Sequence, residues 1–129
     1  MIVRSRSPLR LGLAGGGTDI SPYCDTFGGC VLNATINMYA NCTIELVEEK
    51  NGITFIAQDI KTEFHTALTS NIKLDGDLLL HKAVYNRIVS DFNDNKPLPV
   101  KVYTYSDAPP GSGLGSSSTM VVTIISAYQ

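Results

Sequence analysis

Hydrophobic and polar residues alternate with a period of two along much of the first half of the chain. From Ile2 to Leu13 this alternation is typical of a half-buried strand, with Leu9, Leu11 and Leu13 on the buried side. The same pattern predicts strands at residues 30–36, 41–48, 53–58, 62–68 and 100–105, with 62–68 at a sheet edge. Because Asn-Gly is a strong turn dipeptide, Lys50-Asn51-Gly52 predicts a hairpin between strands 41–48 and 53–58.

Two later segments change to the period of an α-helix. Residues 77–92 carry an apolar stripe at helical spacing, and the polar run 93–97 ends this helix. A second helix is predicted from about Ser117. Because Met120 to Tyr128 is apolar almost all round, we expect this helix to be buried on most faces. The order of elements predicts an α+β domain over residues 1–129, in which a mixed sheet has its helices packed on one face.

The end of the second helix carries no closing signal. Neither Gly nor Asn follows the apolar run, and no Lys or Arg lies in its last turn. This ending predicts that the sequence is the N-terminal part of a longer protein.

Charge and cysteine content narrow the classes of partner. The formal net charge is −2 and the pI is about 5.5, and the chain has no run of Lys or Arg. We therefore expect no basic surface that would bind nucleic acid or an anionic membrane. No segment is apolar enough to span a bilayer or to serve as a signal peptide. The three cysteines include no C-x-x-C pair, which fits a reduced compartment, and we expect a cytoplasmic protein.

The most informative stretch is DAPPGSGLGSSSTM, residues 107–120, between a predicted strand and a predicted helix. Glycines permit positive φ and close approach of a ligand, and a helix N-terminus offers unpaired N–H groups that suit a phosphate. The serines can donate to phosphate oxygens, cap the helix or ligate Mg²⁺. The Lys of a Walker A motif is missing, and Ser116 replaces the third glycine of G-x-G-x-x-G, so both common nucleotide motifs are excluded.

A second glycine-rich turn lies near the N-terminus, in PLRLGLAGGGTD, residues 8–19. The triplet at residues 15–17 would let backbone approach a ligand closely. Asp19 can accept hydrogen bonds from hydroxyl groups, and Arg10 can supply positive charge. Two such turns in one short domain favour a binding role over ordinary loops.

These two motifs resemble the GHMP kinases, the family of galactokinase, homoserine kinase, mevalonate kinase and phosphomevalonate kinase. Its second signature reads roughly Pro-x-x-x-Gly-Leu-Gly-Ser-Ser-Ala, and Ser118 departs by standing where Ala is common. The segment RSPLRLGLAGGGTDISPY, residues 6–23, is similar to the first signature in the branch that acts on heptose 7-phosphate. The resemblance implies a ribosomal protein S5 domain 2-like fold, normally followed by a C-terminal domain that supplies the other half of the active site.

The resemblance also assigns roles to individual residues. It implies that Arg10 is catalytic, stabilising charge on the transferred phosphoryl group or polarising the acceptor hydroxyl. It implies that substrate is bound by Gly16, Gly17, Thr18 and Asp19, with Asp19 on the sugar hydroxyls. ATP would be bound by Pro110, Gly111, Ser112, Gly113, Leu114, Gly115, Ser116, Ser117 and Ser118, and Mg²⁺ by Ser117. Structural alternatives stay open: Arg10 as an exposed strand residue, Asp19 as a loop cap and Ser118 as a helix N-cap.

The function that follows is that of an ATP-dependent kinase of a sugar phosphate, acting on the anomeric hydroxyl of a heptose 7-phosphate for surface polysaccharide synthesis. Other GHMP substrates of the mevalonate, homoserine or galactose type are the first alternative, and a non-catalytic nucleotide- or sugar-binding module is the second. The catalytic base and the third signature of the family would lie beyond residue 129, so the chain alone is expected to be inactive. A homodimer also remains open.

Four other residues that often carry chemistry are assigned structural roles. His65 and His81 have no metal-ligand spacing and are expected to be ordinary surface or packing histidines. Cys24 and Cys30 are expected to be small buried residues.

Overall fold

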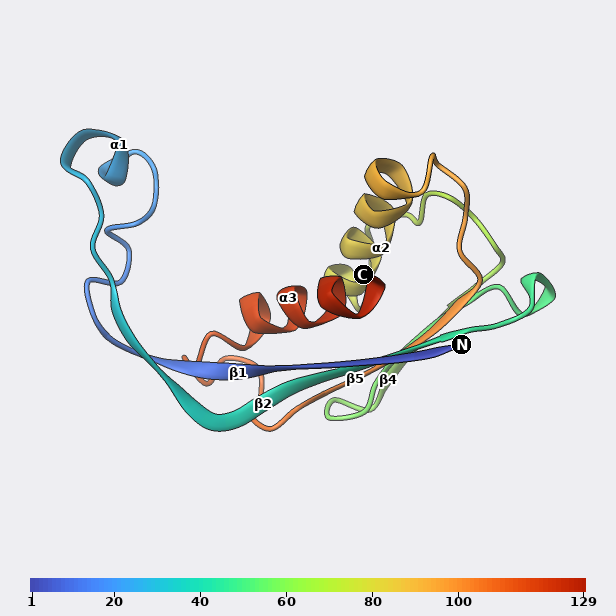
Figure 1. Cartoon of the computed structure of the whole chain (residues 1–129), viewed down its shortest axis with the longest axis horizontal. Helices are drawn as coiled ribbons and strands as arrows, with labels where there is room; N and C mark the ends of the chain where they lie inside the picture. Colours follow the sequence, from blue (N-terminus) through green and yellow to red (C-terminus); the bar gives the residue numbers. More distant parts are fainter.

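The computed structural model describes residues 1–129 as one mixed sheet with two long helices on the same face (Figure 1). The elements are β1 (Ile2–Ala14), α1 (Tyr23–Phe27), β2 (Leu32–Leu46), the 3₁₀ turn η1 (Glu49–Asn51), β3 (Ile53–Ala57), β4 (Thr62–Thr66), α2 (Leu79–Phe92), β5 (Val100–Ser106) and α3 (Ser116–Tyr128). The strand order is β1-β2-β5-β3-β4, in which only the β3–β5 pair is parallel. The predicted α+β class, the mixed sheet and the edge strand β4 are confirmed.

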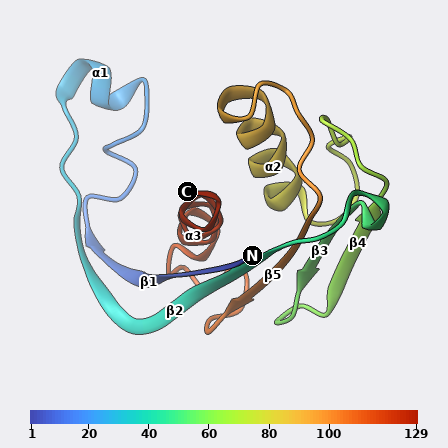
Figure 2. The same ribbon diagram turned by 45° about the vertical axis from the view of Figure 1, so that its right-hand side comes forward.

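One long strand replaces two predicted ones. The segments 30–36 and 41–48 form the single strand β2, so the predicted break between them is wrong. Pairing with β1 keeps the intervening residues extended, although the register shifts between Pro8 and Arg10. Pairing of β2 with β5 ends at Ala40. Beyond it, residues 10–14 of β1 and 32–39 of β2 continue as an arm, whose tip carries α1 on the same side of the sheet as α3 (Figures 1 and 2).

The hairpin predicted at Asn51-Gly52 is also wrong. A local turn does form there, with Gly52 at φ 63°, but β2 and β3 are not paired. Strand β5 lies between them and pairs antiparallel with β2 from Ala40↔Ser106 to Leu46↔Val100. The reason is burial, because insertion between β2 and β3 places the alternating buried side chains of β5 at the centre of the sheet and gives both of its backbone edges a partner strand.

The core lies between the sheet and the two long helices. It consists of Leu9, Ala40, Cys42, Ile44, Ile53, Phe55, Ala57, Ile72, Leu78, Val84, Tyr85, Val89, Val100, Val102, Ala108, Met120, Ile124 and Ala127. Leu11 and Leu13, predicted to be buried with Leu9, are 45% and 55% exposed. They lie on the arm, where neither long helix covers the sheet (Figure 2).

Helix α3 is buried on one face only, which corrects the prediction of burial on most faces. Its inward side packs on β1, β2 and β5, and Ser5 Oγ donates a hydrogen bond to the carbonyl of Thr123 at 2.6 Å. On the outer side Val122 is 55% and Ile125 38% exposed. None of the helices has the length and hydropathy needed to cross a bilayer.

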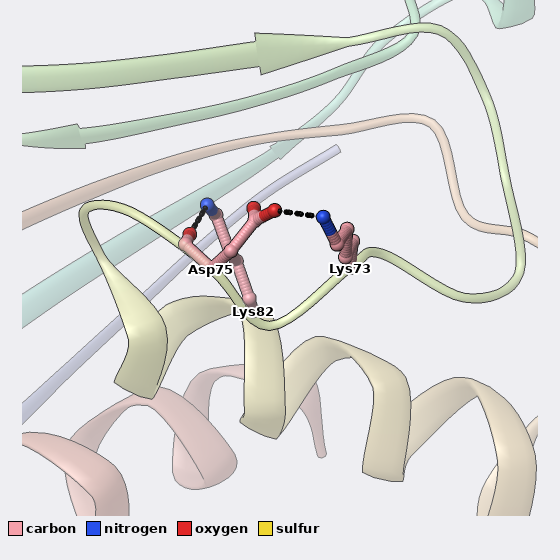
Figure 3. A network of polar contacts seen from close by, with 3 residues as sticks. All are labelled: Lys73, Asp75 and Lys82. Atoms are coloured by element: carbon pink, nitrogen blue, oxygen red, sulfur yellow. Dashed lines mark hydrogen bonds and ion pairs between the residues drawn. The ribbon is translucent and has the colours of Figure 1, made fainter.

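The segment between β4 and α2 is attached through a buried lysine (Figure 3). Lys82 is buried, its ammonium donates to the carbonyl of Asp75 at 2.6 Å, and the same group lies 4.1 Å above the Phe64 ring. The Asp75 carboxylate pairs with Lys73 at 2.7 Å, but both side chains are exposed, so this ion pair adds little stability. Lys82 is therefore the stronger attachment.

Tyr85 makes a second attachment of the loops that flank α2. Its ring is fully buried, and its hydroxyl lies 2.9 Å from the Thr69 carbonyl and accepts the Leu98 N–H at 3.0 Å. Replacement by Phe leaves these buried groups without their partner. We expect Tyr85→Phe to lower the free energy of unfolding by about 1–3 kcal/mol in urea titrations. Tyr105→Phe, at a half-exposed tyrosine of β5, is the control. Equal unfolding midpoints for the two variants would contradict this role.

Candidate active site

Residues 107–115 connect β5 to α3 as a loop with three left-handed glycines. Gly111, Gly113 and Gly115 have φ of 80°, 74° and 69°. Gly115 is the N-cap residue of α3, and its carbonyl accepts the Thr119 N–H at 3.0 Å. The backbone N–H groups of residues 113–118 have no acceptor within the chain. A row of free donors at the positive end of a helix has the geometry that suits an anion.

The three serines after Gly115 contribute hydroxyl groups with no intramolecular hydrogen bond. No side chain caps α3, so the alternative role of Ser118 as its N-cap is wrong. Ser117 and Ser118 are exposed, and Ser116 is half-buried. The hydroxyls are therefore free to contact a ligand or its counter-ion.

Arg10 joins the two predicted motifs. Its backbone N–H donates to the Leu114 carbonyl at 3.1 Å. A Cβ added to Gly115 would lie 3.0 Å from Arg10 Nε, so the arginine side chain lies directly against this glycine. Arg10 is exposed and forms no ion pair, but it is more than an isolated strand residue, because it brings positive charge to the end of the glycine-rich loop of residues 107–115.

The glycine turn at residues 15–18 is closed against the segment that follows α1. The Thr18 hydroxyl lies 2.7 Å from the Gly15 carbonyl and 3.1 Å from the Cys30 carbonyl, and it accepts the Cys30 N–H at 3.1 Å. Gly15 has φ 76°, and an added Cβ there would overlap the Cys30 carbonyl. Thr18, predicted to bind substrate, therefore has its hydrogen-bonding capacity occupied in holding the turn.

The remaining residues of this turn face open space. Added Cβ atoms at Gly16 and Gly17 would meet no neighbour, and the exposed Asp19 carboxylate makes no hydrogen bond or ion pair, so it does not cap the loop. The structure brings Arg10 to the glycine-rich loop of residues 107–115, whereas residues 16–19 follow the end of β1. The cysteine prediction fails nearby, because Cys30 is exposed and Cys24 only half-buried.

A cavity of about 160 Å³ lies beside the glycine-rich loop of residues 107–115, between the first turns of α2 and α3. Its lining is Ala57, Asp59, Ile60, Leu80, His81, Thr104, Ser106, Ala108, Pro110, Ser116, Ser117 and Met120. No Lys or Arg lies among these residues, and Asp59 is acidic, so the cavity suits a neutral group with apolar faces better than a phosphate. A larger hollow of about 500 Å³, at the other end of α3, is lined mainly by hydrophobic residues.

His81 is the residue of this cavity that sequence reasoning undervalued. It is a packing histidine, as predicted, and is only 7% exposed; its Nε2 lies 2.8 Å from Thr104 Oγ1, while Nδ1 has no partner. Burial lowers the pKa of His81 from 6.5 to about 4, and the charge of Asp59 opposes this only partly. The neutral imidazole is thus part of the folded state at pH 7. His65, by contrast, is exposed on β4.

Comparisons with known proteins place these features in a family. Residues 79–129, which span α2, β5, the loop and α3, match the model of the GHMP kinases N-terminal domain. The chain is 49% identical over 126 residues to D-glycero-alpha-D-manno-heptose 7-phosphate kinase of Campylobacter jejuni, which covers 98% of this chain and 37% of the relative. The chain carries the N-terminal domain of the GHMP kinases.

Solved structures of GHMP kinases share the fold. The crystal structure of a D-glycero-D-manno-heptose 1-phosphate kinase from Bacteroides thetaiotaomicron superposes with a TM-score of 0.90 at 51% identity, over 99% of this chain and 41% of that one. Mevalonate kinase of Methanococcus jannaschii, at 20% identity, has a TM-score of 0.75 over 99% of this chain and 39% of its own, and it supports the fold alone. The chain spans about two fifths of the length of these GHMP kinases.

The role found for Thr18 predicts a difference between two substitutions. Thr18→Ser keeps the hydroxyl that bridges Gly15 and Cys30, whereas Thr18→Val keeps the volume and loses the hydrogen bonds. We expect amide hydrogen exchange in residues 15–30 to accelerate at least about tenfold in the valine variant, the effect of losing a hydrogen bond of about 1.4 kcal/mol. The serine variant should exchange like wild type. If the valine variant is equally protected, the hydroxyl does not hold the turn.

Burial of His81 predicts a loss of stability in acid. Because the unfolded histidine binds its proton near pH 6.5 and the folded one only near pH 4, stability conferred by neutral His81 is present above pH 6.5. It is lost as the pH falls towards 4, with a slope approaching about 1.4 kcal/mol per pH unit. Urea unfolding between pH 7 and pH 4 measures it. His81→Gln should flatten the slope, with His65→Gln as control, and an unchanged slope in His81→Gln would contradict this assignment.

Proposed function

We propose that this chain is the ATP- and substrate-binding part of a kinase that phosphorylates a heptose phosphate. The observation that carries the proposal is the row of unpaired N–H groups at residues 113–118, with Arg10 packed against it, in a chain about half identical to heptose phosphate kinases. These donors fit the phosphates of a nucleotide. The cytoplasm, where ATP is present, is the expected compartment.

The two parts of the nucleotide have separate places in this proposal. The phosphates would lie on the phosphate-binding loop, residues 107–115, where Gly111 and Gly113 leave room for close approach and Arg10 packs against Gly115. Pro110 and Ser112 would form its rim. The nucleoside enters the cavity between α2 and α3, whose apolar walls suit a flat heterocycle and whose lining carries no cation. Ser116 and Ser117 line both places and so lie near the boundary between them.

The residues present fit a magnesium ion held mainly by the nucleotide. Mg²⁺ prefers oxygen ligands and usually keeps waters and substrate phosphates, and the exposed Ser117 hydroxyl is free to take one position. No group of three His, Cys, Asp or Glu side chains gathers anywhere in the chain. When bound, the ion would offset the negative charge of the phosphates. The protein's own contribution there is the hydroxyl, the backbone donors and Arg10.

The phosphoryl transfer itself needs few groups from this chain. A substrate hydroxyl oxygen bonds to the γ-phosphorus while the bond to the β–γ bridging oxygen breaks, and the hydroxyl proton passes to a base. Arg10 would stabilise the negative charge on the transferred group. The resemblance to the family assigns the base to a segment that follows the second signature, so no residue of this chain is proposed for that step.

The sugar would be held from the side of the arm. The Asp19 carboxylate, free of protein partners, would accept hydrogen bonds from sugar hydroxyls, with Gly16 and Gly17 allowing close approach. The name of one heptose kinase specifies a 7-phosphate and the name of the other a 1-phosphate. We propose that the acceptor is a heptose 7-phosphate and that the anomeric hydroxyl is phosphorylated. A product activated at this position could then be joined to a nucleotide for polysaccharide synthesis.

The test is ATP consumption by the complete kinase, with a panel of sugar phosphates, mevalonate and homoserine. We expect turnover with a heptose 7-phosphate. Ser117→Ala should lower kcat/KM about a hundredfold, the usual effect of removing one preorganised polar contact. Asp19→Asn should raise KM for the sugar while KM for ATP stays near wild type. Ser126→Ala, an exposed serine at the other end of α3, is the matched control.

Two outcomes would redirect the proposal. Turnover with mevalonate or homoserine, but with no sugar phosphate, would assign the chain to another branch of the GHMP kinases. ATP binding without turnover of any acceptor by the complete protein would favour a non-catalytic nucleotide-binding module.

A further inference from the structure

The first residue after β5, Asp107, is attached to β2 by two hydrogen bonds. Its backbone N–H donates to the Tyr39 carbonyl at 2.9 Å, and its carboxylate Oδ2 accepts the Tyr39 N–H at 2.7 Å. The last regular pair of this ladder is Ala40↔Ser106, so Asp107 lies opposite Tyr39. Here a side-chain carboxylate occupies the place that a main-chain carbonyl takes in the rest of the ladder.

This exchange of acceptors lets the chain leave the sheet at a defined point. The Tyr39 N–H stays paired although the main-chain carbonyl of Asp107 no longer faces β2. The loop can therefore turn away towards α3 without an unpaired donor on the strand. Ser106 supports the same turn, because its Oγ donates to the Ala108 carbonyl at 2.9 Å.

The far end of the loop has its own attachment, on β1. The Arg10 N–H donates to the Leu114 carbonyl. Arg10 and Tyr39 lie close to the register shift of the β1–β2 pair, where Pro8 is opposite Tyr39 and Arg10 is opposite Thr35. The phosphate-binding loop is thus held near both ends by β1 and β2, and Gly111 and Gly113 lie between the two attachments.

We propose that Asp107 is a positioning residue of the phosphate-binding loop, acting through its carboxylate on the Tyr39 N–H. The consequence of this role rests on the proposed function. It is that the backbone N–H donors of residues 113–118 are preorganised to bind a nucleotide. It does not make Asp107 a ligand. A carboxylate in contact with phosphates would repel them, whereas one committed to a strand N–H contributes only geometry.

Three variants separate this role from a general effect of charge. Asp107→Ala removes the acceptor, Asp107→Asn keeps an acceptor oxygen without the charge, and Glu49→Ala removes an exposed acid from η1. We expect Asp107→Ala to weaken ATP binding by the complete kinase about tenfold, the equivalent of about 1.4 kcal/mol. The asparagine variant should stay within about threefold of wild type. Glu49→Ala should bind ATP as wild type does.

The sugar substrate and hydrogen exchange provide independent readouts. KM for the sugar should change less than about twofold in Asp107→Ala, while the Tyr39 amide and residues 111–118 exchange faster than in wild type. Wild-type ATP affinity with a protected Tyr39 amide in Asp107→Ala would overturn the proposal. Equal losses in the alanine and asparagine variants would also overturn it, because charge would then be the cause.

Failure of the proposed function would look different. If the wild-type protein binds no ATP, the kinase proposal fails. Amide hydrogen exchange at Tyr39 and residues 111–118 is then the only test of the positioning role of Asp107. Faster exchange in Asp107→Ala, restored in Asp107→Asn, would still establish the positioning role. Unchanged exchange in Asp107→Ala would refute it.

Discussion

Strand β5 occupies the centre of the sheet, and the positions of the glycine-rich loop, of helix α3 and of the adjoining cavity depend on it. It pairs with β2 on one side and β3 on the other, and its inward residues Val100, Val102 and Thr104 are buried. The glycine-rich loop of residues 107–115 begins where this pairing ends, and α3 begins where the loop ends. Because the parallel strand β3 ends beside β5, the cavity that accompanies the loop forms at the same edge of the sheet.

Several polar groups of the chain are satisfied internally, whereas others have no partner within the chain. Buried or half-buried donors such as the Tyr85 hydroxyl, the Lys82 ammonium and the Thr18 hydroxyl all have partners within the chain. The donors of residues 113–118 have none. Since unpaired N–H groups at a helix end are tolerated where water or an anion can reach them, this is the place where the fold retains binding capacity. The unpartnered Nδ1 of His81, at the wall of the adjoining cavity, is a smaller case of the same division.

The arm is a second region of the molecule with a different structural character. Its core is thin, because the strands extend past α2 and α3, and it is held by backbone pairing and by the Thr18 bridge. Apolar residues such as Leu11 and Leu13 remain exposed there, while Asp19 has no protein partner. Strand pairing with little side-chain burial can open locally at a low free-energy cost, which suits a region proposed to bind a sugar.

Local sequence determined the elements and the chemistry of the main site. Period-two and helical patterns are properties of a few neighbouring residues, and they gave β1, β5, α2 and the edge strand β4 nearly at their observed bounds. The glycines of residues 107–120 carry their own conformational preferences, so the left-handed turns of this loop were also predictable from the sequence. Arg10 and Asp19 were recognisable as candidates by type and by their spacing from a glycine triplet.

Tertiary structure alone decided the pairings between distant residues. The hairpin signal at Asn51-Gly52 formed only a local turn, because the partner of β2 is chosen by burial of β5 and not by the turn. Likewise, no local pattern shows that Leu9 is buried while Leu11 and Leu13 are exposed, because this depends on where the helices above the sheet end. Only the folded sheet brings together the residues of three contacts. These are the hydrogen bond from Thr18 to Cys30, the contact of Arg10 with Gly115 and the hydrogen bonds between Asp107 and Tyr39.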